Sequence, residues 1–438
     1  MSGRDKRFHL AWFTNAVPHG WMDGKASPWA GNDITEWMTG EFLIDMARSL
    51  DRACFDYIML EDHVAFDHMA GLTARLDPIS MMPLMAEATT GLGVVATMST
   101  SFYPPFLLAR TAASLDHLTR GRMGWNIVTT SEHEAAHAFG MEAQPSHGER
   151  YERAAEYTDL VCQLWDGWDP DAIVMNEETG QYVDPSKVKR LDFQGKYYKC
   201  KGALNIARSP QGRPVLCQAG TSERGRDFSA KYADTILVST GGANDYGVMK
   251  EIRDDIRSRA VKIGRDPDEI KLLYMITPIM AESEAEAERL WHLRKPPLTP
   301  ASIKGMVEGL SRLGQIDLTQ YDLDEPLPFI DITKLDGHQA TFNSFYRSWD
   351  GKKTFREMLA RRGGVSSLDL FGTPTQVADR MEEAMEAIGG DGFLLQCRPL
   401  TRRYITEVTE GLVPILQKRG LVRKKYEHTQ LRDNLREF

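Results

Sequence analysis

The sequence is poor in the features that mark several large classes of protein. Its five cysteines are scattered over 438 residues without a C-x-x-C pair, which argues against a disulfide scaffold or zinc ribbon and predicts a reduced, cytoplasmic protein. No apolar run approaches the ~18 residues of a membrane-spanning helix, and residues 1–13 lack the apolar segment of a secretory signal. The formal charge is −9 with both signs interspersed, so neither nucleic acid nor a membrane is expected as a partner.

Several motifs of nucleotide-binding proteins and hydrolases are missing as well. No G-x-G-x-x-G follows the first predicted strand, which weakens a dinucleotide-binding fold, and there is neither a P-loop nor a G-x-S-x-G nucleophile elbow. The composition, 42% apolar and 26% charged, is that of a soluble globular protein. The function therefore has to be inferred from the strands, their ends and the loops that follow them.

Eight short apolar runs recur along the chain, with helix-like segments between them. They are residues 9–13, 55–60, 91–98, 123–128, 214–218, 235–239, 272–280 and 392–397. This alternation predicts a (β/α)8 TIM barrel, an α/β fold, with an open doubly wound sheet as the alternative. Two stretches outside the pattern, about 169–204 and 283–370, are interpreted as insertions into a single domain of residues 1–438.

The segment from 110 to 130, RTAASLDHLTRGRMGWNIVTT, predicts a helix that stops at Gly121 and turns into the buried fourth strand. Asn126 places a polar amide in that strand, which is costly without partners. Asp62 follows the second strand and Thr97 lies near the end of the third. Ligands bind at these strand ends in a barrel, so the three polar groups predict one site at its mouth. The aromatic neighbours expected there are Phe13, Phe66 and Trp125.

A second candidate feature follows the fifth strand, in the turn of residues 219–226. Ser222 is placed to cap the next helix, whose free N–H groups and dipole suit a phosphate; an ordinary N-cap is the equally weighted alternative. His147 and Tyr151 lie four residues apart at the start of a strong helix over 149–165. They either bind the edge or phosphate of a flavin, or His147 merely caps that helix.

Two further segments carry chemistry-bearing residues. His133 and His137 match the H-E-x-x-H pattern of zinc proteases, but position 143 is Ala where the extended pattern wants His, and the segment directly follows a strand. We therefore expect no metal site and interpret the match as accidental. The loop of residues 18–37 is too long for a plain connection and is expected to cover the barrel mouth with His19 and Trp21.

Three long motifs resemble a known family. They are SFYPPFLLARTAASLDHLTRGRMGWNIVTT (101–130), HGERYERAAEYTDLVCQLWDGW (147–168) and ARSPQGRPVLCQAGTSERGR (207–226). The chain resembles the flavin-dependent monooxygenases of the bacterial luciferase-like superfamily. Within it, the similarity is to the nitrilotriacetate, EDTA and dibenzothiophene-sulfone monooxygenases.

The resemblance implies a barrel that uses FMN as FMNH2, supplied by a separate NAD(P)H-dependent flavin reductase, to oxygenate a small organic substrate with O2. By motif, the cofactor contacts fall on Asp62, Thr97, His147, Tyr151 and Ser222, with Asn126 as a further contact. His19 and His63 are the candidate catalytic residues, which would orient oxygen or substrate. The predicted substrate pocket consists of Phe13, Trp21, Phe66 and Trp125.

The aromatic mouth favours a small or medium, largely apolar or heteroaromatic compound, and the lack of an Arg/Lys cluster in the mouth loops disfavours a polyanionic chelator. The resemblance adds organosulfur and amine compounds, of the kind met in xenobiotic degradation. Three other functions stay open: deazaflavin-dependent hydride transfer on the same fold, a zinc hydrolase built on His133 and His137, and a flavin-storage protein. The resemblance also implies a homodimer or homotetramer.

Overall fold

The computed structural model describes residues 6–17, 21–22, 25–26, 36–64, 74–242, 244–294, 298–360, 365–397 and 400–438. Eight parallel strands close into a barrel in the order β1-β16-β13-β12-β11-β6-β5-β4. The strands are β1 (His9–Asn15), β4 (Tyr57–Glu61), β5 (Gly93–Ser99), β6 (Met123–Val128), β11 (Val215–Gln218), β12 (Thr235–Val238), β13 (Lys271–Ile276) and β16 (Gly392–Leu395). This confirms the predicted TIM barrel and its eight strands.

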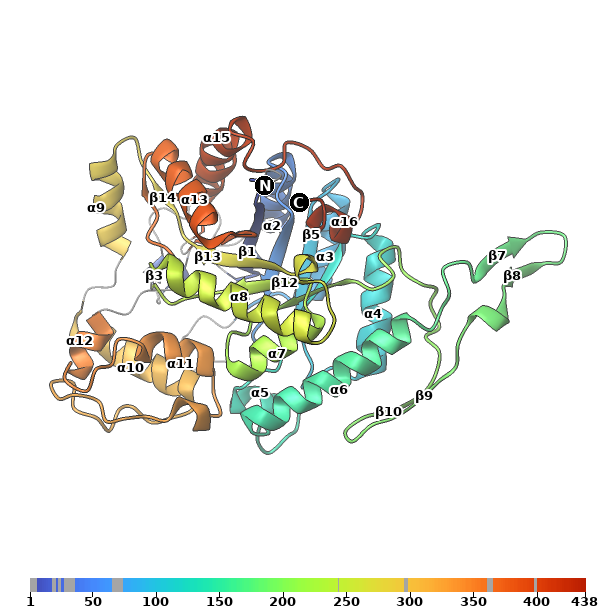
Figure 1. The fold of residues 1–438 in the computed structure, drawn as a ribbon, viewed down its shortest axis with the longest axis horizontal. Helices are drawn as coiled ribbons and strands as arrows, with labels where there is room; N and C mark the ends of the chain where they lie inside the picture. The colour runs from blue at the N-terminus through green and yellow to red at the C-terminus, as the bar shows by residue number, and fades with distance from the viewer. Residues whose placement is uncertain are drawn as a thin grey trace.

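Helices follow most of the strands and cover the outside of the barrel (Figure 1). They are α2 (Glu41–Arg52), α3 (Pro78–Glu87), α4 (Pro105–Leu118), α5 (His133–Ala138), α6 (His147–Trp165), α7 (Glu223–Tyr232), α8 (Tyr246–Lys262), α13 (Pro374–Ile388), α14 (Arg402–Thr406) and α15 (Val413–Lys418). The predicted run 272–280 is not one strand. It divides into β13 and the short β14 (Ile279–Met280), because Pro278 between them has no N–H for a sheet ladder.

Side chains alternate between the inside and the outside of the barrel. Along β6, Trp125 and its second neighbours Met123 and Ile127 pack in the layer between strands and helices. The intervening Asn126 therefore faces inward. The interior holds a separate apolar cluster, formed by Ala11, Tyr57, Met59, Val95, Val215, Cys217, Leu273, Met275 and Leu394. Because this cluster fills the barrel, its centre is a packed core.

The helix α16 (Leu431–Leu435) closes one end of the barrel. Leu431 and Leu435 belong to the interior apolar cluster, although they lie far along the chain from most of the strands. The approach is close: a Cβ on Gly93, at the start of β5, would lie 2.6 Å from Cδ1 of Leu431. Since Gly93 and His9 begin their strands, α16 covers the amino-terminal end and leaves the carboxyl end for ligands.

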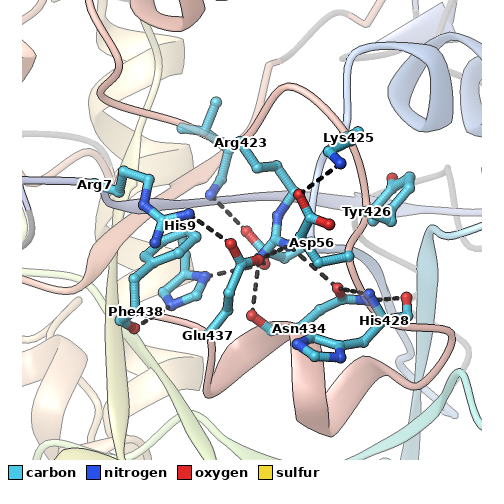
Figure 2. Close-up of polar contacts among 12 residues, drawn as sticks. Arg7, His9, Asp56, Arg423, Lys425, Tyr426, His428, Asn434, Glu437 and Phe438 are labelled. Atoms are coloured by element: carbon cyan, nitrogen blue, oxygen red, sulfur yellow. Dashed lines mark hydrogen bonds and ion pairs between the residues drawn. The ribbon is translucent and has the colours of Figure 1, made fainter.

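A buried charge cluster fastens this C-terminal segment to the barrel (Figure 2). Asp56 accepts hydrogen bonds from His9 Nδ1 at 2.9 Å, Arg423 Nη2 at 2.6 Å and the Leu10 N–H at 3.0 Å. Arg423 also donates to Glu437 at 2.9 Å. Burial alone would raise the pKa of Asp56, but Arg423 and His9 outweigh it and lower the pKa.

We expect Asp56→Ala to destabilise the fold by about 3–5 kcal/mol, because it leaves the Arg423 charge buried and unpaired. Urea unfolding gives the value. Asp379→Ala, which breaks the exposed ion pair with Arg419, is the matched control and should cost less than about 1 kcal/mol. Since the folded pKa of Asp56 is lowered, its contribution should be complete above the unfolded pKa of about 4 and fall as the pH drops through the folded value. Equal losses in both variants would contradict the assignment.

Two groups of elements interrupt the barrel pattern. Between α6 and β11 lie β7 (Ile173–Asn176), β8 (Gln181–Val183), β9 (Leu191–Gln194) and β10 (Lys199–Gly202), which pair as two antiparallel ribbons. The β7–β8 ribbon projects away from the barrel (Figure 1). Between β14 and β15 (Phe371–Gly372) lie α9 (Glu284–Arg294), α10 (Pro300–Gly314), α11 (Gln339–Tyr346) and α12 (Phe355–Ala360). The division into a single domain with insertions stays a prediction.

Residues 299–360, here called the cap unit, have a small apolar core of their own. It includes Val307, Leu310, Phe342, Phe355 and Met358, and it is separate from the cores of the barrel.

In the part of the chain that the structure describes, no helix combines the length and apolar character needed to cross a membrane.

Candidate active site

The carboxyl ends of β5 and β6 bring two predicted site residues into direct contact. Thr97 and Asn126 are register partners on neighbouring strands, and both are buried, with exposed fractions of 3% and 4%. The Asn126 amide donates to Thr97 Oγ1 at 2.8 Å. The two strands thus present one polar pair to the interior of the barrel near its open end.

The Asn126 side chain is only half satisfied. Its Oδ1 atom is buried and has no hydrogen-bond partner among the residues that the structure describes. A buried acceptor without a donor costs about 1–3 kcal/mol, so such an atom points to a bound ligand with an N–H or O–H group. This oxygen is a physical indication of a polar ligand at the mouth.

The start of α6 brings His147 and Tyr151 together. Ser146 caps the helix by accepting from the Glu149 N–H at 3.3 Å, and the two rings lie 5.0 Å apart. The helix therefore begins at His147, two residues before the predicted start. Burial, reinforced by the positive charges of Arg150 and Arg224, lowers the pKa of His147 to about 4. His147 is consequently neutral at pH 7.

The start of α7 lies beside the start of α6. Ser222 is the N-cap and accepts from the Gly225 N–H at 3.2 Å. Burial raises the pKa of the Tyr151 hydroxyl. The hydrogen bonds of Tyr151 with Ser222 and Gln218 oppose part of this rise. Arg224 of α7 donates to the Gly148 carbonyl of α6 at 3.3 Å, so the starts of α6 and α7 meet, and the Tyr151 ring packs 6.1 Å from Phe228 farther along α7. A neutral, hydrogen-bonding tyrosine and the positive end of a helix dipole suit a phosphate.

Two more polar residues follow β4. Burial is the main cause that raises the pKa of Asp62 to about 6, and Arg75 opposes it. Asp62 accepts from the His63 N–H at 2.8 Å. The His63 ring faces Glu132, with 3.5 Å between Nε2 and Oε1. Asp62 and His63 thus join the mouth from the β4 side.

Glu132, which the sequence interpretation missed, lies between two histidines. Besides His63, the Glu132 carboxylate contacts Nε2 of His338 at 3.4 Å. Burial alone would raise its pKa, but the hydrogen bonds and charges of His338 and His63 hold the pKa of Glu132 far below its ordinary value. Glu132 is therefore ionised and joins loops that are distant along the chain.

Trp125 corrects the predicted substrate pocket. The alternation along β6 turns it away from the interior, where its ring lies 6.0 Å from Tyr157 and 6.2 Å from Trp165 of α6. Its Nε1 donates to the Met98 carbonyl at 2.9 Å. Trp125 therefore packs between barrel and helix. Phe13, by contrast, packs against the interior apolar cluster and is partly buried.

Three predicted residues lie wholly or partly outside the part of the chain that the structure describes. His19 and Phe66 lie outside the described residues, and for Trp21 the structure describes the backbone, in β2 (Trp21–Met22), but not the side chain. The H-E-x-x-H segment forms α5, a helix of six residues. There His137 contacts the Glu142 carbonyl at 2.9 Å and His133 Nδ1 accepts from the Gln144 N–H at 3.3 Å, so both histidines bind the backbone of their own loop.

Barrel and mouth together define a class: a (β/α)8-barrel protein with a buried polar pair at the carboxyl ends of its strands and, beside it, the Ser222-capped start of a helix. The sequence model of the family described as "Luciferase-like monooxygenase" matches residues 9–392, and the chain belongs to this family. It is therefore an enzyme of the monooxygenase class.

Similarity to individual relatives extends over the whole chain. The N-acetyl-S-(2-succino)cysteine monooxygenase of Bacillus subtilis (strain 168) is 34% identical, with 99% of this chain and 97% of the relative covered. The dibenzothiophene-sulfone monooxygenase of Rhodococcus erythropolis (strain XP) is 33% identical over the same shares. Among solved structures, a riboflavin lyase crystallised with modified FMN and riboflavin is similar at 31% identity and a TM-score of 0.85, with 99% of this chain and 96% of that chain covered.

We expect His147→Gln to flatten the pH dependence of stability between about pH 6.5 and 4. The folded pKa of about 4 lies below the unfolded one, so the unfolded state takes up a proton first and wild-type stability falls as the pH drops through this window. Urea unfolding at several pH values measures the effect. His292→Gln, at an exposed histidine, is the control. A variant that loses stability as steeply as the wild type would contradict the assignment.

Proposed function

We propose that this chain is the oxygenating component of a two-component system, and that it takes FMNH2 from a separate NAD(P)H-dependent flavin reductase. The observation that carries the proposal is the meeting of Ser222 and Tyr151 at the start of α7, which suits a phosphate. FMN has a phosphate at one end and ring N–H groups at the other. The ring groups suit the unpartnered Asn126 oxygen. The residues present therefore fit this cofactor.

In this proposal each residue at the mouth has a binding role. Ser222 and Tyr151 hold the phosphate, and neutral His147 borders it. Asp62, Thr97 and Asn126 face the ring. Bound reduced flavin supplies the electrons that activate O2. The apolar interior of the barrel borders the site on the side of the amino-terminal end. It excludes water from that side, which limits side reactions with water.

The proposed substrate is a small organic compound, of the heteroaromatic, organosulfur or amine type. Phe13, Trp21 and Phe66 remain the proposed pocket residues, and His19 and His63 the residues that orient oxygen or substrate. The names of two relatives support the organosulfur choice, because one acts on a thioether, N-acetyl-S-(2-succino)cysteine, and the other on dibenzothiophene sulfone. Assembly as a homodimer or homotetramer stays a prediction, which sedimentation velocity tests.

Turnover is expected only when reduced FMN is supplied, which NAD(P)H, FMN and a flavin reductase do together. Oxygen uptake coupled to loss of a sulfide or sulfone substrate measures it. Omitting the reductase should abolish turnover. Supplying photoreduced FMN under air in place of the reductase should restore it. Oxidation of substrate by the chain with NADH and no flavin would overturn the proposal.

Ser222→Ala should weaken FMN binding by about 10- to 100-fold, because a hydrogen bond to a charged group contributes about 1.5–3 kcal/mol. Flavin fluorescence titration measures the dissociation constant. Riboflavin, which lacks the phosphate, should bind the variant and the wild type equally.

A matched control separates this effect from the loss of a helix cap. Thr373→Ala removes the N-cap of α13 and should cost about 0.5–2 kcal/mol of stability, as should Ser222→Ala. Thr373→Ala should leave FMN affinity unchanged. A Ser222 variant that binds FMN like the wild type would contradict the phosphate site.

A further inference from the structure

The cap unit touches the barrel at the site itself. It is a separate group of helices, α10 to α12, in Figure 1, and its apolar core does not merge with those of the barrel. Residues 336 and 338, just before the start of α11, make polar contacts to the mouth. These contacts link the position of the cap unit to the residues of the mouth.

Asp336 binds the first turn of α6. Its Oδ1 accepts from the His147 N–H at 3.1 Å, and its backbone carbonyl accepts from Arg150 Nη2 at 2.6 Å. The Arg150 side chain is buried and also donates to the Pro145 carbonyl at 2.7 Å. A carboxylate on the free N–H groups of a helix start stabilises that start. Asp336 therefore caps the same turn of helix that presents His147 and Tyr151.

Glu132 provides the second contact. Its buried carboxylate lies between His63, which follows β4, and His338 of the cap unit, at 3.5 and 3.4 Å. Glu132 itself follows β6, the strand that carries Asn126. One carboxylate thus links two loops of the mouth to the cap unit.

The backbone between the two contacts has little freedom. A Cβ on Gly337 would lie 2.0 Å from the Leu313 carbonyl oxygen of α10, and the His338 N–H donates to that same oxygen at 2.6 Å. The segment that carries Asp336 and His338 is therefore held against the body of the cap unit. A shift of the cap unit would carry both side chains with it.

We propose that Asp336 is a positioning residue that couples the docking of the cap unit to the binding of flavin, with Glu132 as its companion contact. The inference rests on the proposed function. A docked cap unit orders the start of α6 for the cofactor, and a bound cofactor holds that start in place for Asp336. Because binding free energies are linked, each event strengthens the other by the same factor.

Hydrogen–deuterium exchange and FMN titration of the full chain test this coupling. FMN should slow exchange in residues 299–360 of the wild type, beyond the protection at α6 and α7. Asp336→Ala should raise the dissociation constant of FMN about tenfold, or about 1.4 kcal/mol, and abolish the added protection of the cap unit. Asp336→Asn keeps an oxygen acceptor for the His147 N–H and should restore most of both.

Asp331→Ala is the matched control. Asp331 lies in the same unit and accepts from the Thr333 N–H and hydroxyl, so its loss perturbs the cap unit locally. It should leave FMN affinity and the cofactor-dependent protection unchanged. An equal loss of FMN affinity in the Asp331 variant would show that any damage to the cap unit suffices and would overturn the role of Asp336.

Two failures are distinguishable. If the wild type binds FMN but Asp336→Ala binds it equally well and the cap unit exchanges equally with and without FMN, the coupling is wrong and the proposed function stands. If the wild type binds neither FMN nor FMNH2, the proposed function falls and the coupling falls with it.

Discussion

The alternation of side chains along eight strands that close on themselves is the constraint on which the rest of the structure depends. A shift of one residue in any strand would exchange its interior and exterior side chains. The register places Thr97 beside Asn126 inside the barrel and sends Trp125 out against Trp165. Apolar side chains and α16 fill the barrel from the other end. Polar groups therefore gather at the one end that remains open.

Much of this framework could be predicted from the sequence. Strands buried on both faces appear as short continuous apolar runs, which is why all eight were recognisable. The errors have local causes. The run 272–280 contains Pro278, which separates two strands. Placing Trp125 in the same site as its neighbour Asn126 overlooks that adjacent side chains of a strand point to opposite faces. An apolar run indicates that a strand is buried, but it does not indicate its inner side.

The site was predictable only where its chemistry is local. Ser222 follows a strand and begins a helix, and Asn126 is a polar residue in an apolar run, so both stand out within a few positions. Glu132 and His338 are separated by 206 positions, and neither has a neighbouring pattern that marks it. Asp336, in the same insertion, is likewise an ordinary acidic residue of a loop. Contacts that depend on how an insertion folds back cannot be inferred from one sequence by periodicity.

The pairing of β1 with β16 has a consequence for how the protein is made. These strands lie at residues 9–15 and 392–395, so the barrel closes between the first and the last of its strands. At a synthesis rate of about 5–20 residues per second, the edge of β1 that pairs with β16 stays unpaired for about 20 to 80 s. During that time its backbone N–H and C=O groups are open to pairing with other chains. Yield in a heterologous host should therefore depend more on the supply of chaperones than on the stability of the finished barrel.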